Sequence, residues 1–122
     1  MAKKHSPRFL KIVEDARSEI SECLASDLLE LIEQGAIVID VREKHEFESG
    51  HFSGAIHIGK GVIERDIEKF EFSTSTKLVL YCGGGFRSAI AAKSLIEMGY
   101  EDVTSLWGGW RGILAEGLET SN

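Results

Sequence analysis

The order of apolar segments along the chain predicts an α/β domain built on a mainly parallel sheet. Four apolar or β-branched segments are expected to form strands: residues 36–41 (AIVIDV), 55–58 (AIHI), 77–82 (KLVLYC) and 102–107 (DVTSLW). The first and third are nearly continuous apolar runs, as expected when both faces of a sheet are covered. The gaps between the four segments are long enough for crossover connections, whereas a hairpin needs only a few residues.

Helical patterns occupy these gaps and follow the last strand. The expected helices are residues 43–49, 61–70, 87–98 and 109–118. Before the first strand, Ser26 is a suitable N-cap for a short helix that Gly35 would end.

The N-terminal part of the chain has an amphipathic pattern of its own. Residues 6–24 place apolar side chains at helical spacing and leave charged side chains for the opposite face. We therefore expect an N-terminal amphipathic helix extension over residues 1–20 and a single domain over residues 21–122. The apolar stripe of the extension is expected to pack against the domain, with a dimer interface or a partner-docking helix as the alternative.

Composition excludes several classes of protein. The chain has 122 residues, 43% of them hydrophobic and 28% charged, which fits one globular domain rather than a disordered or membrane protein. The net charge of −6 argues against a nucleic-acid partner, and no apolar run is long enough to span a membrane. With two cysteines and no signal-peptide pattern, we expect a reducing cytoplasm in which Cys82 remains a free thiol.

The segment YCGGGFRSA, residues 81–89, combines a cysteine with features that favour a negative charge. Cys82 ends a predicted strand, and the carboxyl ends of strands are where open α/β sheets bind ligands. The three glycines that follow allow the backbone N–H groups to converge into an anion-binding nest. The N-terminus of the next helix and the guanidinium of Arg87 add positive charge. Together these features favour a thiolate over a thiol and an anionic substrate beside it.

A plain structural interpretation competes with this one. A cysteine at a strand end is often a small buried apolar residue, and glycines after a strand often form a turn. Either feature alone would favour that interpretation, but the combination favours a reactive cysteine. The spacing also excludes a dinucleotide fingerprint, because Ser88 stands where G-x-G-x-x-G requires its last glycine.

Three ordered motifs make the chain resemble the single-domain rhodaneses of the sulfurtransferase superfamily. They are IDVREKHEFESGHFSGAIHI (39–58), YCGGGFRSA (81–89) and GYEDVTSLWGGW (99–110). The resemblance covers about residues 18–118. It implies a three-layer fold with a central, mainly parallel sheet of about five short strands flanked by helices.

The resemblance also implies a chemistry for the loop. Cys82 would accept a sulfane sulfur from thiosulfate or another donor and carry it as a persulfide. Arg87 would orient the anionic donor, and the loop residues Gly83, Gly84, Gly85, Phe86 and Ser88, with their backbone amides, would surround the transferred sulfur. The acceptor would be cyanide or a cellular thiol, which could belong to a protein, and ping-pong kinetics would follow. No metal or organic cofactor is implied.

The spacing between Cys82 and Arg87 separates this chemistry from its relatives. Four residues lie between them, whereas the similar cysteine phosphatases have five and enclose a tetrahedral phosphate in the larger ring. A phosphatase or arsenate reductase is therefore disfavoured. A non-catalytic or very slow sulfur-carrier or partner-binding module remains the alternative function.

Other residues attract weaker functional interpretations. Asp40 and Arg42 belong to the first motif and are expected to form a structural ion pair, because an unpaired carboxylate at the end of a buried strand is costly. Cys23 is expected to be a buried apolar residue unless the fold brings it near Cys82. The remaining candidates are expected to be structural: His45, His51 and His57 as non-ligands, and Trp107 and Trp110 as packing residues. Phe86 either lines the mouth of the loop or packs.

Overall fold

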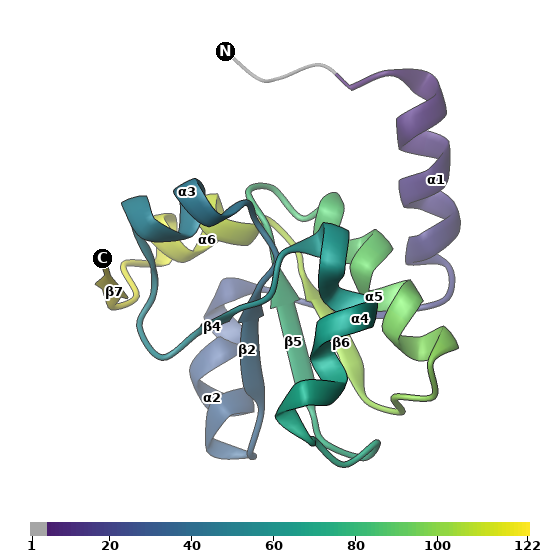
Figure 1. Cartoon of the computed structure of the whole chain (residues 1–122). Coiled ribbons are helices and arrows are strands. Elements are labelled where there is room, and N and C mark those ends of the chain that lie inside the picture. Colours follow the sequence, from purple (N-terminus) through teal and green to yellow (C-terminus); the bar gives the residue numbers. More distant parts are fainter. Residues whose placement is uncertain (1–4) are drawn as a thin grey trace.

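A computed structural model describes residues 5–122, so the first four residues of the expected extension lie outside the described part. The longer helices and the helical turns are α1 (Pro7–Arg17), η1 (Ala25–Asp27), α2 (Leu28–Glu33), α3 (Lys44–Ser49), η2 (Lys60–Val62), α4 (Ile63–Asp66), η3 (Ile67–Phe70), α5 (Arg87–Glu97) and α6 (Gly109–Glu116). The strands are β1 (Ser21–Cys23), β2 (Ile37–Asp40), β3 (His51–Phe52), β4 (Ile56–His57), β5 (Leu78–Tyr81), β6 (Val103–Leu106) and β7 (Thr120–Ser121). Figure 1 shows their arrangement.

Five of the strands form one parallel sheet in the order β1-β6-β5-β2-β4. The predicted α/β fold with a parallel sheet flanked by helices is confirmed. β5 lies in the middle and is fully buried, which explains its continuous apolar sequence. Because all five strands run the same way, their carboxyl ends meet at one edge, where the segments after β2, β5 and β6 come together (Figure 1).

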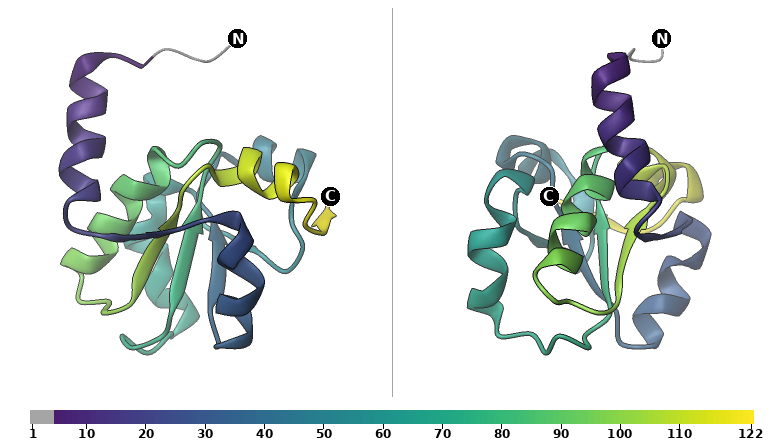
Figure 2. Two further views of the ribbon diagram at one scale, coloured as in Figure 1. Left: turned by 180° about the vertical axis from the view of Figure 1, so that it is seen from behind. Right: turned by 90° about the vertical axis from the view of Figure 1, so that its right-hand side faces the viewer.

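The two faces of the sheet are covered by separate sets of helices. Leu78 and Leu80 of β5 point into a core shared with α4, η3 and α5, whereas Val79 and Tyr81 point into a core shared with α2 and α6. This alternation follows from the two-residue period of a strand. The result is a three-layer fold with the sheet in the middle (Figure 2).

The N-terminal segment departs from the sequence expectation. The helical pattern over residues 6–24 predicted a longer helix than the structure has: α1 ends at Arg17, and Ser21–Cys23 form the edge strand β1 beside β6. The strand was missed because its short sequence, SEC, has a single apolar residue and lies at an exposed edge. β3 and β7 form a further antiparallel pair that the sequence analysis also missed, being only two residues long each.

α1 packs on α5, as expected for its apolar stripe. Ser6 caps the helix by accepting the backbone N–H of Phe9 at 3.2 Å, and Pro7 occupies its first position. Val13 and Ala16 are buried against Ala89 of α5. The N-terminal end of α1 extends beyond the carboxyl ends of the strands (Figures 1 and 2), which brings its first turn toward the Cys82 loop.

Within the described residues, no helix is both long and apolar enough to cross a membrane.

Candidate active site

The sulfur of Cys82 lies at the carboxyl end of β5, enclosed by the loop that leads into α5. The residue is only 1% exposed. The backbone N–H groups of Gly85 and Ser88 donate to its Sγ at 3.1 and 3.3 Å. Its thiol lies 3.5 Å from the hydroxyl of Ser88, which in turn lies 2.8 Å from the hydroxyl of Ser105. Converging N–H donors at the start of a helix are the groups that stabilise a negative charge on sulfur.

Of the three loop glycines, one is required by its backbone conformation. Gly85 has a φ of +97°, and a Cβ there would lie 3.1 Å from the nitrogen of Gly108 and 3.2 Å from the carbonyl oxygen of Leu106. A side chain would therefore be strained in conformation and crowded against the end of β6. Gly83 and Gly84 instead leave the loop open toward a pocket.

A second close approach ties α6 to the same loop. The N–H groups of Trp110 and Arg111 donate to the carbonyl oxygens of Cys82 and Gly83, at 2.7 and 3.2 Å. Gly109 allows this contact: its φ is +49°, and a Cβ there would overlap the Cys82 carbonyl oxygen. Gly109, the second glycine in GGW of the third motif, thus allows the first turn of α6 to lie against the Cys82 loop.

Arg87, the first residue of α5, is paired with a carboxylate that the sequence analysis did not identify. Its Nη1 and Nη2 donate to the two oxygens of Glu46, on α3, at 3.0 and 3.2 Å. Glu46 Oε1 also accepts the backbone N–H of Glu43, at 2.9 Å. The hydrogen bonds from Arg87 lower the pKa of Glu46 to about 2, more than its partial burial raises it. The positive charge expected from Arg87 is therefore largely neutralised within the protein.

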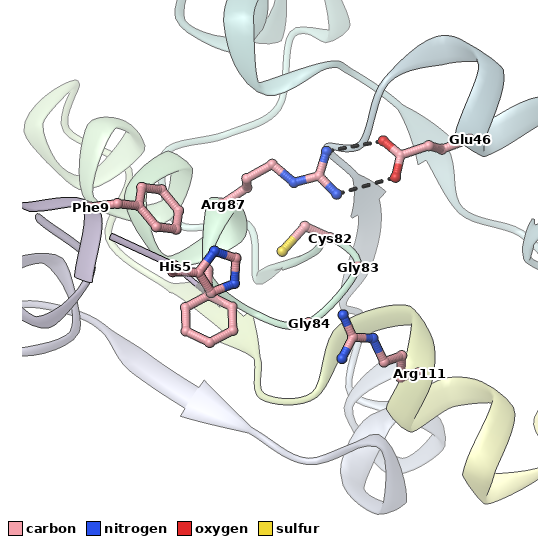
Figure 3. A pocket seen from close by; sticks show the side chains of 9 residues that line it. His5, Phe9, Glu46, Cys82, Gly83, Gly84, Arg87 and Arg111 are labelled. Carbon is pink, nitrogen blue, oxygen red and sulfur yellow. Dashed lines mark hydrogen bonds and ion pairs between the residues drawn. The ribbon is translucent and has the colours of Figure 1, made fainter. Parts of the chain in front are cut away.

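A pocket of about 440 Å³ opens above Cys82. The residues that line it are His5, Phe9, Glu46, Cys82, Gly83, Gly84, Phe86, Arg87 and Arg111. In Figure 3, the Arg87–Glu46 pair lies on one side of Cys82 and Arg111 on another, and His5 and Phe9 come from the N-terminal segment. The pocket is thus built from α1, α3, α5 and α6 around the end of one strand.

Phe86 both lines the mouth of the loop and packs against neighbouring side chains. It lines the pocket, and it packs against the rings of His5 and Phe9, with centroid distances of 4.5 and 6.4 Å. The guanidinium of Arg17 lies 5.1 Å from its ring centroid and 4.5 Å from that of Trp107. Arg17 also donates to the carbonyl oxygen of Gly85, at 3.4 Å, so the N-terminal helix contacts the Cys82 loop directly.

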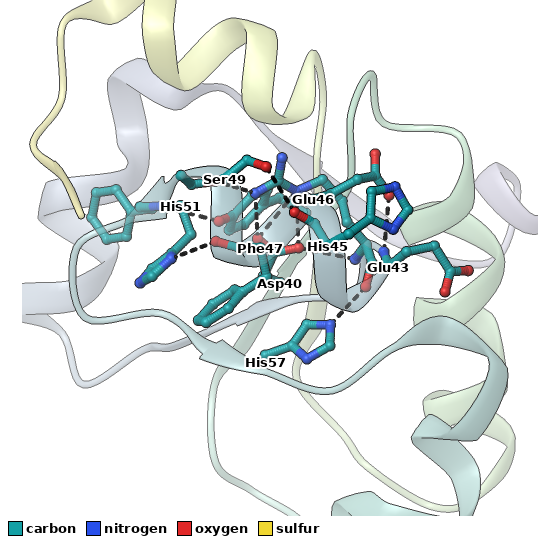
Figure 4. A network of polar contacts seen from close by, with 12 residues as sticks. Asp40, Glu43, His45, Glu46, Phe47, Ser49, His51 and His57 are labelled. Atoms are coloured by element: carbon teal, nitrogen blue, oxygen red, sulfur yellow. Dashed lines mark hydrogen bonds and ion pairs between the residues drawn. The ribbon is translucent and has the colours of Figure 1, made fainter. Parts of the chain in front are cut away.

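The first motif forms a rigid support beside the pocket (Figure 4). The guanidinium of Arg42 donates to the carboxylate of Asp40 through Nε and Nη2, with Nη2 2.8 Å from Oδ2, and both side chains are buried. Nη2 of Arg42 also donates to the carbonyl oxygen of Gly50, at 2.7 Å. The structural ion pair expected for these two residues is confirmed.

Two of the three histidines of the first motif, His51 and His57, belong to the same support, whereas His45 is exposed. His51 donates from Nδ1 to the carbonyl oxygen of Phe47 at 2.9 Å and stacks on its ring, and His57 donates from Nε2 to that of Arg42 at 2.7 Å. Among residues 5–122, no three His, Cys, Asp or Glu side chains are grouped as a metal site would require.

Cys23 lies outside the pocket and is set in a different environment. It ends β1, two strands away from β5, which places it roughly 10 Å from Cys82. A disulfide needs Cα atoms within about 7 Å, so the two cysteines cannot form one without backbone movement. Burial, with the carboxylates of Asp27 and Glu22, raises the pKa of Cys23 to about 11. A resolving role for Cys23 is therefore not supported.

The structure gathers all the predicted site residues around one sulfur atom. Cys82, Gly83, Gly84, Phe86 and Arg87 line the pocket, while Gly85 and Ser88 contact the sulfur from the protein side. The groups that come from other elements were not predicted from the sequence; they are His5, Phe9, Glu46, Ser105 and Arg111. For Glu46 and Arg111 a signal existed, since both lie in the first turn of a helix that follows a strand next to β5, and these helices start at the same edge of the sheet as the Cys82 loop.

This arrangement has a counterpart among known proteins: residues 24–116 match the family described as Rhodanese-like domain. The chain belongs to the rhodanese-like domain family. The expected family and fold are thereby confirmed, and membership links the chain with sulfur-transfer chemistry.

Relatives of the rhodanese-like domain differ in length and in name. The chain is 36% identical over 88 residues to the tRNA uridine(34) hydroxylase of Bacillus cereus (strain Q1), a match that covers 63% of this chain and 25% of that relative. A solved protein of unknown function from Rhodopseudomonas palustris, named as a possible tyrosine phosphatase, superposes with a TM-score of 0.84 at 26% identity, with 99% of both chains covered. A rhodanese-related protein from Thermoplasma volcanium superposes with a TM-score of 0.72 at 27% identity and covers 83% of this chain and 97% of its own.

Proposed function

We propose that this rhodanese-like domain is a sulfurtransferase that carries a sulfane sulfur as a persulfide on Cys82. The observation that supports it best is the position of the sulfur, which receives two backbone N–H groups at the bottom of an open pocket. Nucleophilic sulfur chemistry needs a thiolate, and N–H donors at a helix start favour that form. No metal or organic cofactor enters the proposed reaction.

With thiosulfate as donor, the reaction has two half-steps. The Cys82 thiolate attacks the outer sulfur of thiosulfate, a new S–S bond forms on Cys82, and the S–S bond of thiosulfate breaks. Sulfite leaves with the bonding electron pair. In the second half-step, cyanide or a cellular thiol attacks the outer persulfide sulfur and restores the Cys82 thiolate, which gives ping-pong kinetics.

Arg87 has the role of orienting the donor beside Cys82. A guanidinium has five N–H donors, and Glu46 accepts two of them, so others remain for an anion at the mouth of the pocket. The amides of the loop surround the incoming sulfur. Ser88 and Ser105 extend the hydrogen bonding behind it.

Phosphatase chemistry has less support. Only four residues separate Cys82 from Arg87, one fewer than the five of the cysteine phosphatases, whose larger ring encloses a tetrahedral phosphate. A tRNA hydroxylase function also has less support. The match covers only 25% of the tRNA uridine(34) hydroxylase, and the net charge of −6 does not favour binding to tRNA. A slow carrier that passes sulfur to one protein partner is the second candidate, because it would use the same persulfide.

The proposal is tested by incubating the protein with thiosulfate and measuring its intact mass and the sulfite released. The wild type is expected to gain the mass of one sulfur atom and release sulfite in equal amount. Cys82→Ser should gain none, whereas Cys23→Ser, the matched control, should behave like the wild type. The absence of an adduct on the wild type, or an equal adduct on Cys82→Ser, would overturn the proposal.

A further inference from the structure

Two arginines reach the Cys82 pocket, and only one of them has a carboxylate partner. Arg87 is bound by Glu46, whereas Arg111 forms no ion pair with any residue between 5 and 122. Arg111 enters the pocket from α6, with its Cζ 3.9 Å from the point that a Cβ on Gly84 would occupy. Figure 3 places it apart from the Arg87–Glu46 pair, across the loop that holds Cys82. Arg111 is therefore, among the described residues, an arginine of this pocket whose charge is available to a ligand.

The position of Arg111 in α6 argues against a stabilising role for its positive charge. It is the third residue of the helix, in the first turn, where the helix dipole disfavours a cation. The start of the helix is nevertheless fixed against the Cys82 loop by the two hydrogen bonds from Trp110 and Arg111 to the loop carbonyls. The hydrogen bonds thus fix the helix turn that carries the Arg111 side chain. An anionic ligand bound there would compensate for the unfavourable position of its positive charge.

The opposite wall of the pocket is aromatic. His5 lies 5.1 Å from Phe9 and 4.5 Å from Phe86, measured between ring centroids. Phe9 belongs to the first turn of α1, and Val13 and Ala16 anchor this helix on α5. Two of the three rings therefore come from the N-terminal extension, which lies outside the matched family region of residues 24–116.

The size of the pocket fits an organic molecule. Its volume of about 440 Å³ lies in the range of roughly 300–1,000 Å³ that is usual for small-molecule sites, far more than an inorganic thiosulfate ion needs. We propose that the pocket selects organic sulfur donors that carry an anionic group for Arg111 and an apolar or aromatic group for the wall of His5, Phe9 and Phe86. This inference rests on the proposed sulfur transfer and names its substrate class.

An organic thiosulfonate, R–SO₂–S⁻, can donate its terminal sulfur to Cys82 by a simple substitution. The Cys82 thiolate attacks the terminal sulfur, the new S–S bond forms, and the bond between that sulfur and the sulfonyl sulfur breaks. The sulfinate R–SO₂⁻ leaves with the electron pair. No oxidant, reductant or cofactor is consumed.

Two donors with the same reacting group test the aromatic wall. The rate of persulfide formation on Cys82 is measured with methanethiosulfonate and with benzenethiosulfonate. Each rate is divided by the rate at which a small free thiol reacts with the same donor, which removes the difference in intrinsic reactivity between the donors. The wild type is expected to prefer the benzene donor. Phe9→Ala should reduce that preference about three- to tenfold, the size of an aromatic contact. Leu10→Ala, which truncates an exposed residue of the same helix, should leave it unchanged.

Arg111→Gln tests the anion site. It should lower kcat/KM about tenfold or more for both donors, as expected when a hydrogen bond to a charged group is lost. Arg8→Gln removes the same charge from an exposed position outside the pocket and is the matched control. If Arg111→Gln and Phe9→Ala behave like their controls while transfer proceeds, this inference is wrong and the proposed function stands.

Binding of benzenesulfonate, an unreactive anion with the same ring, separates the two proposals. It is measured by titration calorimetry on Cys82→Ser, alone and combined with Arg111→Gln or Phe9→Ala. Binding that both substitutions weaken would support the inference even if no donor transfers sulfur. Binding that neither substitution weakens would overturn it, and the absence of both binding and transfer would overturn both proposals.

Discussion

Two arginine–carboxylate pairs flank the Cys82 loop, and they differ in burial rather than in chemistry. In the Asp40–Arg42 pair the side chains are 0% and 4% exposed, and the guanidinium lies over the rings of Trp110 and Tyr81, 4.7 and 5.6 Å from their centroids. In the Glu46–Arg87 pair the side chains are 29% and 35% exposed, and both line the pocket.

The difference in burial separates a pair that supports the fold from a pair that a ligand in the pocket can reach. A buried charge without a partner is expensive, so each member of the Asp40–Arg42 pair depends on the other. A half-exposed pair contributes little to stability because water competes for both charges. The Glu46–Arg87 pair can therefore be rearranged by a ligand at small cost, whereas the buried pair holds β2, Gly50 and α6 in place.

The largest expected effect comes from breaking the buried pair. Asp40→Ala leaves the guanidinium of Arg42 buried without its carboxylate, and we expect the free energy of unfolding to fall by about 3–5 kcal/mol. Urea unfolding followed by circular dichroism measures it. Asp66→Ala, which breaks the more exposed ion pairs of Asp66 with Arg65 and Lys69, is the control and should cause no comparable loss. A loss no larger than that of the control would mean that burial does not distinguish the two pairs.

Features of the fold and the site that depend on residues close together in the sequence could be predicted, whereas contacts between distant residues could not. The loop was predictable because Cys82, its glycines and Arg87 lie within six residues, and the strands because burial on both faces leaves continuous apolar runs. The partner of Arg87 was not, since Glu46 lies 41 residues away and meets it only through the sheet order. Likewise, local periodicity could not show that the helical pattern over residues 6–24 is interrupted by β1, which depends on pairing with β6.

A smaller effect is expected from the exposed pair, and in activity rather than folding. Glu46→Gln removes the charge that neutralises Arg87, which makes the pocket more positive beside Cys82. We expect KM for thiosulfate to fall about two- to fivefold, corresponding to about 0.5–1 kcal/mol for a partly exposed charge pair. The change should shrink as salt is added, because ions screen exposed charges.

Steady-state kinetics at low and high ionic strength measure this change. Glu48→Gln, an exposed residue of the same helix that does not line the pocket, is the matched control and should leave KM unchanged. An increase in KM for Glu46→Gln would contradict the expectation. It would show that Glu46 matters more for holding Arg87 in position than for cancelling its charge.

The smallest expected effect is the pH dependence of the exposed pair. Hydrogen bonds from Arg87 lower the pKa of Glu46 from its ordinary 4.5 to about 2 in the folded protein. Because the folded pKa is depressed, the stability that the pair contributes is present above the unfolded pKa and is lost as pH falls toward 2. The wild type should therefore be more stable than Glu46→Gln at neutral pH by at most about 1 kcal/mol, the usual size for such a pair.

Paired unfolding curves of the wild type and Glu46→Gln between pH 7 and pH 2 isolate this contribution, since all other titrating groups are common to both proteins. The difference in unfolding free energy should be constant well above pH 4.5 and decrease as the pH falls from there through about 2. A difference that does not change with pH would show that the carboxylate charge of Glu46 adds nothing to the folded state. The Glu46–Arg87 pair would then act through hydrogen-bond geometry alone, and the contrast with the buried pair would rest on position rather than on charge.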